Sequence, residues 1–293
     1  MSKNSEKKIK KSKREGRRIK TLSPMSIIIP YIMPQRCDAL NYIADSIDIT
    51  AAEKYIAQKR AEGYENFGMM HIFLAAYVRT VAEKPGINRF IRGQHVYARN
   101  NIEIMLTIKK EMTANSPDTV VKIFPEPTDT AIDIYKKMNE VVIESKKPAN
   151  TDFDKLMNVL KIIPGLFLRW TVKFLNFLDY FGLLPRFLTK LSPFHGSFFI
   201  TSMGSLGIPP IYHHIYNFGN VPVFLSFGAK RSENYIKADG SVGRRKMVDY
   251  KVVTDERICD GFYYAIALKN IRFYLKNPEK LDTPPVKVVE DIR

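Results

Sequence analysis

The chain has 293 residues, of which 45% are hydrophobic, and it contains 18 Phe and 15 Tyr. This length can bury one large core or two small ones, and the composition fits a globular protein. The two cysteines, Cys37 and Cys259, are too few for a disulfide framework and suit a reducing cytoplasm. The basic start is not followed by an apolar run, so we expect no secretory signal peptide.

The net charge of +16 is concentrated at the N-terminus. Residues 1–20 hold ten Lys or Arg against two acids, Glu6 and Glu15. We predict that residues 1–24 form a basic disordered tail, because they contain little that can be buried. The tail could attract anionic lipid, an acidic protein or nucleic acid, or only increase solubility. No nucleic-acid partner is expected, because no neighbouring pattern is typical of a nucleic-acid-binding fold.

The first half of the chain alternates between strand and helix patterns. Two prolines in residues 25–34 predict an extended segment there. Predicted strands cover residues 41–49, 96–99, 102–109 and 119–124. Predicted helices cover residues 51–61 (N-cap Thr50), 70–84 (closed by Pro85-Gly86) and 129–145 (capped by Asp129).

Residues 152–191 are rich in Leu, Phe, Ile and basic residues. Pro164-Gly165, Gly182 and Pro185 divide them into short predicted helices. The longest piece, residues 166–181, is shorter than the roughly 20 residues of a spanning helix and carries three charges. We expect a hydrophobic helical insertion that packs on the sheet or covers a channel. The alternative is an interfacial element in which Trp170 and the Phe side chains enter an anionic membrane surface.

The C-terminal part contains a strand at 221–229, a hairpin turn at Ala238-Asp-Gly240, and a strand over 247–254. A charged turn, Asp255-Glu-Arg-Ile-Cys-Asp-Gly261, leads into a helix over 262–275 that Asn277-Pro278 ends. A strand that ends in a charged turn before a helix is a favourable place for chemistry.

This turn resembles the Asp-His-Arg-x-x-Asp-Gly signature of the 2-oxoacid dehydrogenase acyltransferase catalytic domains, which are relatives of chloramphenicol acetyltransferase. Glu256 stands at the histidine position. Residues 198–204 resemble the family's Phe-x-Ile-Ser-Asn-x-Gly segment, and Pro85-Gly-Ile-Asn88 resembles its Pro-x-x-Asn. The resemblance covers residues 38–147 and 193–285. It implies an α+β fold, a chloramphenicol acetyltransferase-like mixed sheet with helices in two layers, formed by residues 25–293.

The resemblance also implies roles for residues. In the family, the signature base takes a proton from the thiol of coenzyme A or dihydrolipoamide, and a hydroxyl stabilises the oxyanion. The hydroxyl here is Thr201, with Ser202 beside it. Asp260 is expected to cap the turn with Arg257 nearby, and Gly261 to allow close approach at the helix start. The family builds its channel between the subunits of a trimer, so a homotrimer and coenzyme A as substrate are implied.

Glu256 is a weaker base than histidine. Proton transfer from a thiol with a pKa near 8.5 to a carboxylate is unfavourable by about 4 pKa units, whereas transfer to a histidine is unfavourable by about 2. The difference is about 3 kcal/mol, or roughly a hundredfold in rate. The simpler interpretation is that Glu256 pairs with Arg257 or another basic residue in the turn. His213, His214 or His195 could instead supply a relocated base, although adjacent histidines on a strand point to opposite faces.

Two hypotheses follow. The first is a stand-alone acyltransferase that uses acyl-CoA or a similar thioester and an acceptor that is apolar or lipid-like. The second is a catalytically silent trimeric binding or scaffold protein at a membrane surface. Either would be cytoplasmic and peripheral on the inner face of a membrane. The histidines and cysteines do not have metal-ligand spacing, so no metal is expected.

Overall fold

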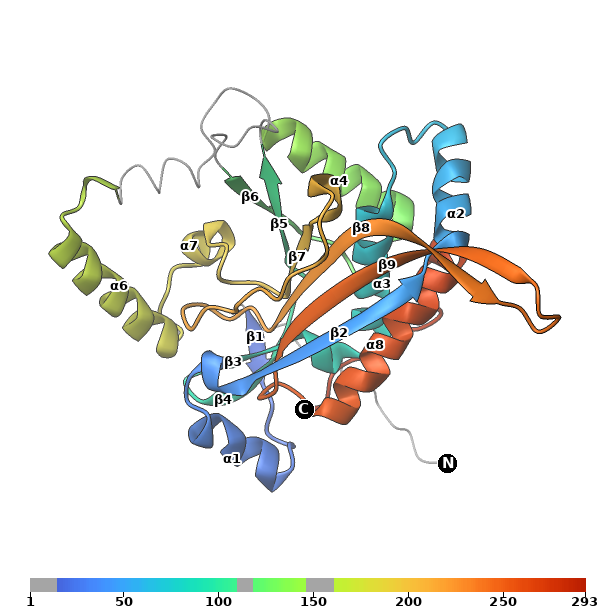
Figure 1. The fold of residues 1–293 in the computed structure, drawn as a ribbon. Helices are drawn as coiled ribbons and strands as arrows, with labels where there is room; N and C mark the ends of the chain where they lie inside the picture. The colour runs from blue at the N-terminus through green and yellow to red at the C-terminus, as the bar shows by residue number, and fades with distance from the viewer. Residues whose placement is uncertain (1–14, 110–117, 146–160) are drawn as a thin grey trace, which may run out of the picture.

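A six-stranded mixed sheet is the centre of the structure, a computed structural model that describes residues 15–109, 118–145 and 161–293 (Figure 1). Its described strands run in the order β2-β9-β8-β7-β5-β6, and β7 pairs in parallel with both β5 and β8. The strands are β2 (Leu40–Asp48), β5 (Ile104–Lys109), β6 (Asp118–Ile123), β7 (Phe198–Ser202), β8 (Val223–Ile236) and β9 (Val242–Asp255). A smaller sheet contains β1 (Gly16–Arg18), β4 (His95–Arg99) and β3 (Arg89–Arg92).

Helices cover one face of the large sheet and make the fold a two-layer α+β structure, as expected. The α-helices are α1 (Pro24–Ile32), α2 (Thr50–Ala61), α3 (Met69–Glu83), α4 (Ala131–Ser145), α6 (Gly165–Tyr180), α7 (Arg186–Leu191) and α8 (Gly261–Lys276). Short 3-10 helices are η1 (Arg36–Ala39), η2 (Pro85–Asn88), η3 (Gly204–Leu206) and η4 (Pro278–Leu281).

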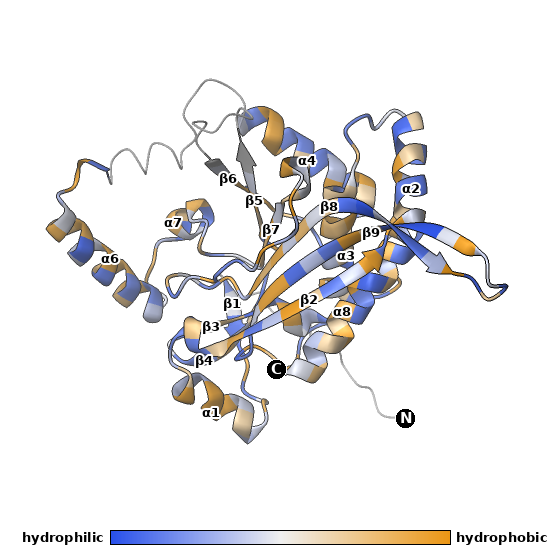
Figure 2. Cartoon of the chain, viewed as in Figure 1, coloured by the Kyte–Doolittle hydropathy of each residue, from blue (hydrophilic) through white to orange (hydrophobic). Residues whose placement is uncertain are grey.

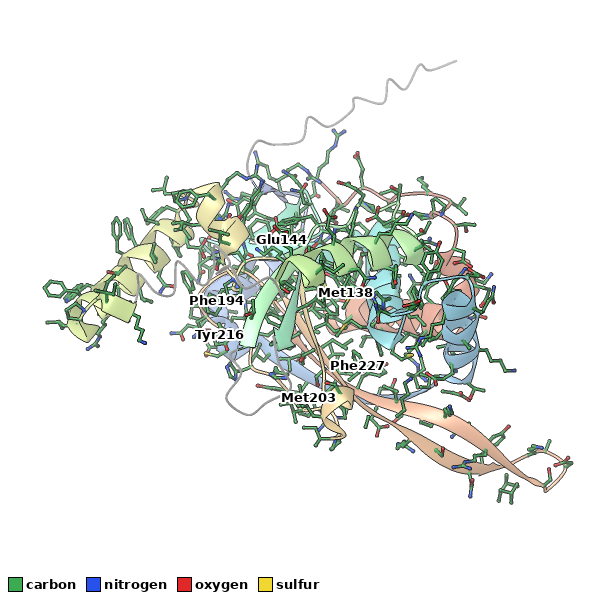
Figure 3. All side chains as sticks on the ribbon, turned by 90° about the horizontal axis from the view of Figure 1, so that it is seen from above. Met138, Glu144, Phe194, Met203, Tyr216 and Phe227 are labelled. Carbon is green, nitrogen blue, oxygen red and sulfur yellow. The ribbon has the colours of Figure 1, made fainter. Side chains whose placement is uncertain are left out.

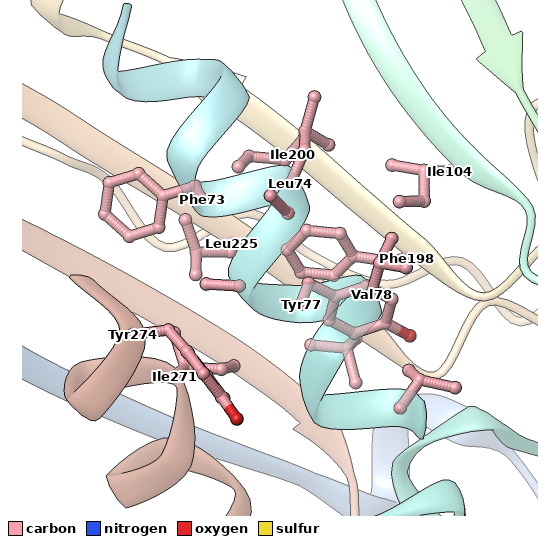
Figure 4. Packing of buried hydrophobic residues seen from close by; sticks show 14 of the residues in the cluster. Phe73, Leu74, Tyr77, Val78, Ile104, Phe198, Ile200, Leu225, Ile271 and Tyr274 are labelled. Atoms are coloured by element: carbon pink, nitrogen blue, oxygen red, sulfur yellow. The ribbon is translucent and has the colours of Figure 1, made fainter. Parts of the chain in front are cut away.

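Helix α3 is the centre of the main core, where it packs between the sheet and α8 (Figure 4). The Tyr77 ring stacks on Phe198 of β7 with centroids 4.0 Å apart, and Phe73 stacks on Phe227 of β8 at 4.8 Å. Burying one such side chain contributes about 1.5–3 kcal/mol. Because Phe198 is on the helix side of β7, its neighbours Phe199 and Thr201 point to the opposite face.

The expected strands, the hairpin and the helices of residues 51–61 and 129–145 are confirmed, with three changes of detail. Helix α2 begins at Thr50, whose N–H donates to Asp48 Oδ1 over 2.8 Å. Helix α4 is capped by Thr130 rather than Asp129, because the Thr130 hydroxyl accepts from the Asp133 N–H. The hairpin turns at Gly240 with φ +81°, and its two strands are longer than predicted.

The predicted disordered tail is wrong for residues 15–24, while residues 1–14 lie outside the described chain. Residues 16–18 form β1, which pairs antiparallel with β4. A Cβ on Gly16 would lie 2.6 Å from the Phe90 ring, so only glycine fits there. Glu15 is buried and ion-paired with Arg92. Pairing with a distant strand is a contact that composition does not reveal.

The extended segment predicted for residues 25–34 is a helix, α1. Pro24 occupies the first turn, where its missing N–H is not needed and its fixed φ favours a helix. The Ser23 hydroxyl accepts from the Ser26 N–H and caps the helix. Pro30 removes only one backbone hydrogen bond near the end of a short helix. Pro34, the second proline behind the prediction, lies after the helix ends at Ile32, so the two prolines do not prevent helix formation.

The insertion is helical as predicted, but its expected packing on the sheet is wrong for α6. Residues 152–160 lie outside the described chain, and α6 and α7 are separated at Gly182, where φ is +68°. None of the α6 residues is buried by the described part of the chain. Figure 3 shows this helix at the edge of the molecule with its side chains directed outward.

The buried Glu15 carboxylate attaches the N-terminal residues 15–18 to the rest of the fold, and this attachment can be tested. Burial alone would raise its pKa, but Arg99, the Thr189 hydroxyl and Arg92 hold it at about 2. The carboxylate therefore stabilises the fold above pH 4.5, and this contribution is lost as the pH falls towards 2. We expect Glu15→Gln to lower the free energy of unfolding at pH 7 by about 3 kcal/mol, measured by urea denaturation.

The exposed Glu65 offers a control, since Glu65→Gln should change stability by less than about 0.5 kcal/mol. Equal stability of Glu15→Gln and wild type at pH 7 would show that the Glu15 carboxylate does not stabilise the fold.

Candidate functional site

The signature turn is built on the buried carboxylate of Asp255 at the end of β9, which is 1% exposed. Arg257 binds it with two hydrogen bonds of 2.8 Å, one to each oxygen. Arg36 adds a third at 3.1 Å, from Nε to Oδ2. The charge of a buried carboxylate must be paired, and two guanidinium groups pair it here.

Arg36 connects this carboxylate to a different part of the chain. Its Nη1 and Nη2 donate to the carbonyls of Tyr216 and Gly219 over 2.5 and 2.8 Å. Burial lowers the pKa of Arg36, and the Asp255 carboxylate opposes that shift. Sequence reasoning missed Arg36, because its partner is 219 residues away and no local pattern marks it.

Glu256 is not part of the ion pair, so its predicted pairing with Arg257 is wrong. Arg257 binds Asp255 instead, since both side chains point inward from the turn. The Glu256 N–H donates to the Ala39 carbonyl over 2.9 Å and fixes the backbone. Its partly exposed carboxylate has no hydrogen-bond or ion-pair partner within residues 15–109, 118–145 and 161–293. The side chain at the base position is therefore free to interact with a substrate.

Asp260 and Gly261, the two remaining signature residues, differ in their importance for the fold. Asp260 is the N-cap of α8 and accepts from the Tyr263 N–H over 2.8 Å. The role expected of Gly261 is wrong: a Cβ there would meet no atom of the described chain within 4 Å. Cys259 between them is buried in the main core, as predicted.

Thr201 lies on the sheet face opposite the helices, in one row with Ser226 of β8 and Lys251 of β9. Residues paired in this way point to the same face. The Ser226 hydroxyl donates to the Ile211 carbonyl, and Lys251 Nζ lies 4.6 Å from the centre of the Tyr212 ring. Thr201 is 8% exposed, and its hydroxyl has no hydrogen-bond partner among the described residues. Ser202, next to it, points to the opposite face.

Residues 208–220 cross this face as an irregular segment, not as a strand. The argument that His213 and His214 alternate as on a strand therefore does not apply. His213 stacks on Phe224 with ring centroids 4.4 Å apart, which places it on the same face as Thr201. Burial, and then the neighbouring His214, lower the pKa of His213. His214 lies edge-on to Tyr216, further towards Arg36.

His195 is a structural residue. It is 1% exposed, its Nδ1 lies 2.8 Å from the Ser192 hydroxyl, and its Nε2 lies 3.3 Å from Asp179 of α6. A histidine enclosed in this way cannot reach a thiol that arrives from solvent. It does not qualify as the relocated base.

Thr201 and the signature turn are far apart within one chain. Thr201 is in register with Lys251, two strands away, and Asp255 is four residues further along β9. Strand spacing and rise separate the Cα atoms of Thr201 and Asp255 by roughly 16 Å. One small reacting group cannot touch both Thr201 and Glu256 of the same copy.

The cavity that adjoins Arg36 on this face is too small to hold a substrate. The cavity between Arg36, Phe199 and His214 has a volume of about 10 Å³, room for about one water molecule. A larger cavity of about 260 Å³ lies elsewhere, beside Asn88 and the C-terminal residues 288–291. No group of three His, Cys, Asp or Glu side chains within the described residues is arranged to hold a metal.

The fold is the chloramphenicol acetyltransferase-like fold of 2-oxoacid dehydrogenase acyltransferase catalytic domains. A probable dihydrolipoamide acetyltransferase from Listeria monocytogenes aligns with a TM-score of 0.57 and 18% identity, over 92% of this chain and 99% of that one. The dihydrolipoamide acetyltransferase of Azotobacter vinelandii aligns with a TM-score of 0.57 and 14% identity, over 89% and 93%.

A truncated catalytic core of the 2-oxoacid dehydrogenase multienzyme complex from Thermoplasma acidophilum has a TM-score of 0.54 and 13% identity, over 89% of this chain and 98% of that one. No protein-family model and no curated protein matches the sequence. At these identities the comparison establishes the fold.

The signature turn allows a test of which residues the fold requires. Asp255→Asn removes the charge between two buried guanidinium groups, and we expect it to lower the free energy of unfolding by about 3–5 kcal/mol. Glu256→Gln, next to it, should change that energy by less than about 0.5 kcal/mol. Chemical denaturation of both variants measures the difference, and similar losses in the two would contradict this assignment.

Proposed function

We propose that the protein transfers an acyl group from a thioester such as acyl-CoA to an acceptor, at a site that neighbouring copies complete. One observation carries the proposal. The Thr201 hydroxyl and the Glu256 carboxylate are both unpaired among the described residues, yet they are too far apart in one chain to act together. A second copy that places its signature turn against the Thr201 face would bring both groups to one substrate.

The chemistry is a balanced exchange. The acceptor's nucleophile attacks the thioester carbonyl while Glu256 takes its proton, and the carbonyl oxygen becomes an oxyanion. The Thr201 hydroxyl donates a hydrogen bond to that oxyanion. The intermediate then releases the coenzyme A thiolate, which takes the proton from Glu256. Coenzyme A is thus a substrate, and the steps require only these two residues and no metal.

A homotrimer is the assembly we propose, because a heterologous contact repeated three times closes a ring with one site at each interface. The extended hairpin of β8 and β9 supports contact between copies. Beyond the sheet its residues are mostly exposed, and Ile236 and Val242 near the turn are 79% and 69% exposed. We place the assembly in the cytoplasm, on a membrane surface, without nucleic acid.

A catalytically silent trimeric scaffold at a membrane surface is the second candidate. The observation that favours it is the replacement of the signature histidine by Glu256 on an otherwise intact turn. Because the fold does not need the side chain at that position, the protein can keep the fold and still lack activity. A trimer that releases no thiol from any acyl-CoA would support the scaffold.

Mixing two inactive variants tests the shared site. We expect Thr201→Ala to lower the rate of thiol release from acyl-CoA by about a hundredfold to a thousandfold, because an oxyanion donor is lost. Glu256→Ala should also lower it. Co-expression of the two should restore about a quarter of the wild-type rate, since random mixing leaves that share of the interfaces with both groups.

Thr201→Ser retains the hydroxyl and is the matched control, for which we expect a rate close to wild type. A mixture with no more activity than its two components would refute a site shared between copies.

The base can be tested by restoring the signature. Glu256→His should raise the rate of thiol release by roughly a hundredfold, because histidine is a stronger base than a carboxylate by about 2 pKa units and takes the proton of the acceptor's nucleophile more readily. His213→Ala and His214→Ala should leave the wild-type rate unchanged. A large loss in His213→Ala with none in Glu256→Ala would instead identify His213 as the base.

A further inference from the structure

Helix α6 presents a large apolar surface. Leu166, Phe167, Trp170, Phe174 and Phe177 are each more than half exposed, and Trp170 is 63% exposed. Figure 2 shows that hydrophobic and hydrophilic residues follow one another along this helix. No helix of the described residues is long and apolar enough to cross a membrane. An amphipathic helix of this kind lies in an interface or against a partner.

Helix α1 presents a second apolar surface, which the sequence pattern did not predict. Its residues carry no charge, and only Pro30 is buried. Met25, Ile28, Tyr31 and Ile32 are each at least half exposed. A short, uncharged helix that contributes one residue to the interior does not serve the core.

The two helices end at the same place, the turn between β3 and β4. Tyr31 of α1 lies against His95, with its hydroxyl 3.5 Å from Nδ1. The carbonyl of Tyr180, at the end of α6, approaches Gly93 so closely that a Cβ there would lie 2.9 Å from it. A common support thus holds both apolar helices near one edge of the structure, and we call these two helices the α1–α6 surface.

The charge of the α1–α6 surface indicates what it binds. Residues 161–190 contain five Lys or Arg and one acid, Asp179, which gives +4. Asp179 is directed inward to His195, 3.3 Å away. Lys173 lies over the Trp170 ring at 5.1 Å, so a cation adjoins the apolar face. Long basic side chains can extend to headgroups while aromatic rings enter the acyl boundary.

We propose that the α1–α6 surface binds a phospholipid membrane that carries anionic headgroups, with α6 in the plane of the interface. The positive charge favours this partner over a second copy of the chain, because that copy would bring the same charge. Each basic residue near such a surface adds attraction to the anionic lipid. Membrane contact covers the apolar side chains that the described chain leaves in water.

The α1–α6 surface is joined to the signature turn. Arg257 Nη1 donates to the carbonyls of Met33 and Pro34, directly after α1, over 3.2 and 3.1 Å. Membrane binding would therefore hold Glu256 close to the lipid boundary. If the acyl transfer proposed above is correct, on which this step rests, the acceptor is an amphiphile that reaches the site from the membrane.

Trp170 is the only tryptophan in the chain, so its fluorescence reports on α6 directly. We expect a blue shift when the full-length protein meets vesicles of phosphatidylcholine with phosphatidylserine, together with co-sedimentation. Pure phosphatidylcholine vesicles should bind at least tenfold more weakly. The absence of both a shift and co-sedimentation with the mixed vesicles would refute the proposal. A Trp170 emission that is already blue-shifted by self-association before vesicles are added would refute it as well.

Substitutions that leave the charge unchanged distinguish vesicle binding by the α1–α6 surface from vesicle binding by the basic N-terminus. Ile28→Ser with Ile32→Ser on α1, and Phe174→Ser with Phe177→Ser on α6, leave the charge unchanged. Each pair should weaken vesicle binding at least tenfold. The control Ile143→Ser, at an isoleucine of α4 that is 65% exposed, should bind as wild type. If either pair of substitutions leaves vesicle binding at the wild-type level, that helix does not take part in membrane binding. Vesicle binding needs no turnover, so its failure and a failure of acyl transfer are separate results.

Discussion

The buried carboxylate of Asp255 is the constraint on which the site depends. It joins four pieces of chain: the end of β9, the η1 turn through Arg36, the irregular segment through the Tyr216 and Gly219 carbonyls, and the end of α1 through Arg257. Each guanidinium reaches both the carboxylate and backbone carbonyls, so few of its donors are left without acceptors. Removing one charge from such a cluster leaves the others buried and unpaired, which costs far more than the cluster contributes as a whole. The arrangement specifies where these segments meet.

This constraint separates the signature into residues that fold the turn and one residue that does not. Asp255 and Arg257 point inward and pair, and Asp260 caps α8. Glu256, between the two paired residues, is partly exposed, and its carboxylate has no hydrogen-bond or ion-pair partner in the described chain. The base position is thus the one whose side chain can change without disturbing the turn. A glutamate at this position leaves the ion pair and the cap of α8 intact.

The sequence predicted what depends on local pattern. Helix α3 and the strands β2, β5 and β9 have periodic apolar residues, and the resemblance of two short segments led to the correct fold. Contacts between distant residues were not accessible in the same way. The pairing of β1 with β4, and of Arg36 with Asp255, depends on segments more than 75 residues apart. Arg257 was paired with its neighbour Glu256 because adjacency was the only information available, whereas the turn directs alternate side chains to opposite sides. Pro30 and Pro34 favour an extended segment in the sequence, but Pro34 lies beyond the end of α1 and Pro30 stands in its last turn, so neither prevents the helix.

The positions of the unpaired groups argue for a protein that works through its surfaces. Thr201 faces away from the helices, Glu256 is partly exposed on its turn, and the cavity between Arg36, Phe199 and His214 has room for about one water molecule. Neither residue lines that cavity. The apolar side chains of α1 and α6 are likewise left uncovered, and exposed apolar patches of this kind mark contacts with a partner or a membrane. Since Arg257 binds both Asp255 and the chain that leaves α1, the exposed helix and the turn that carries Glu256 are attached to the same buried ion-pair cluster.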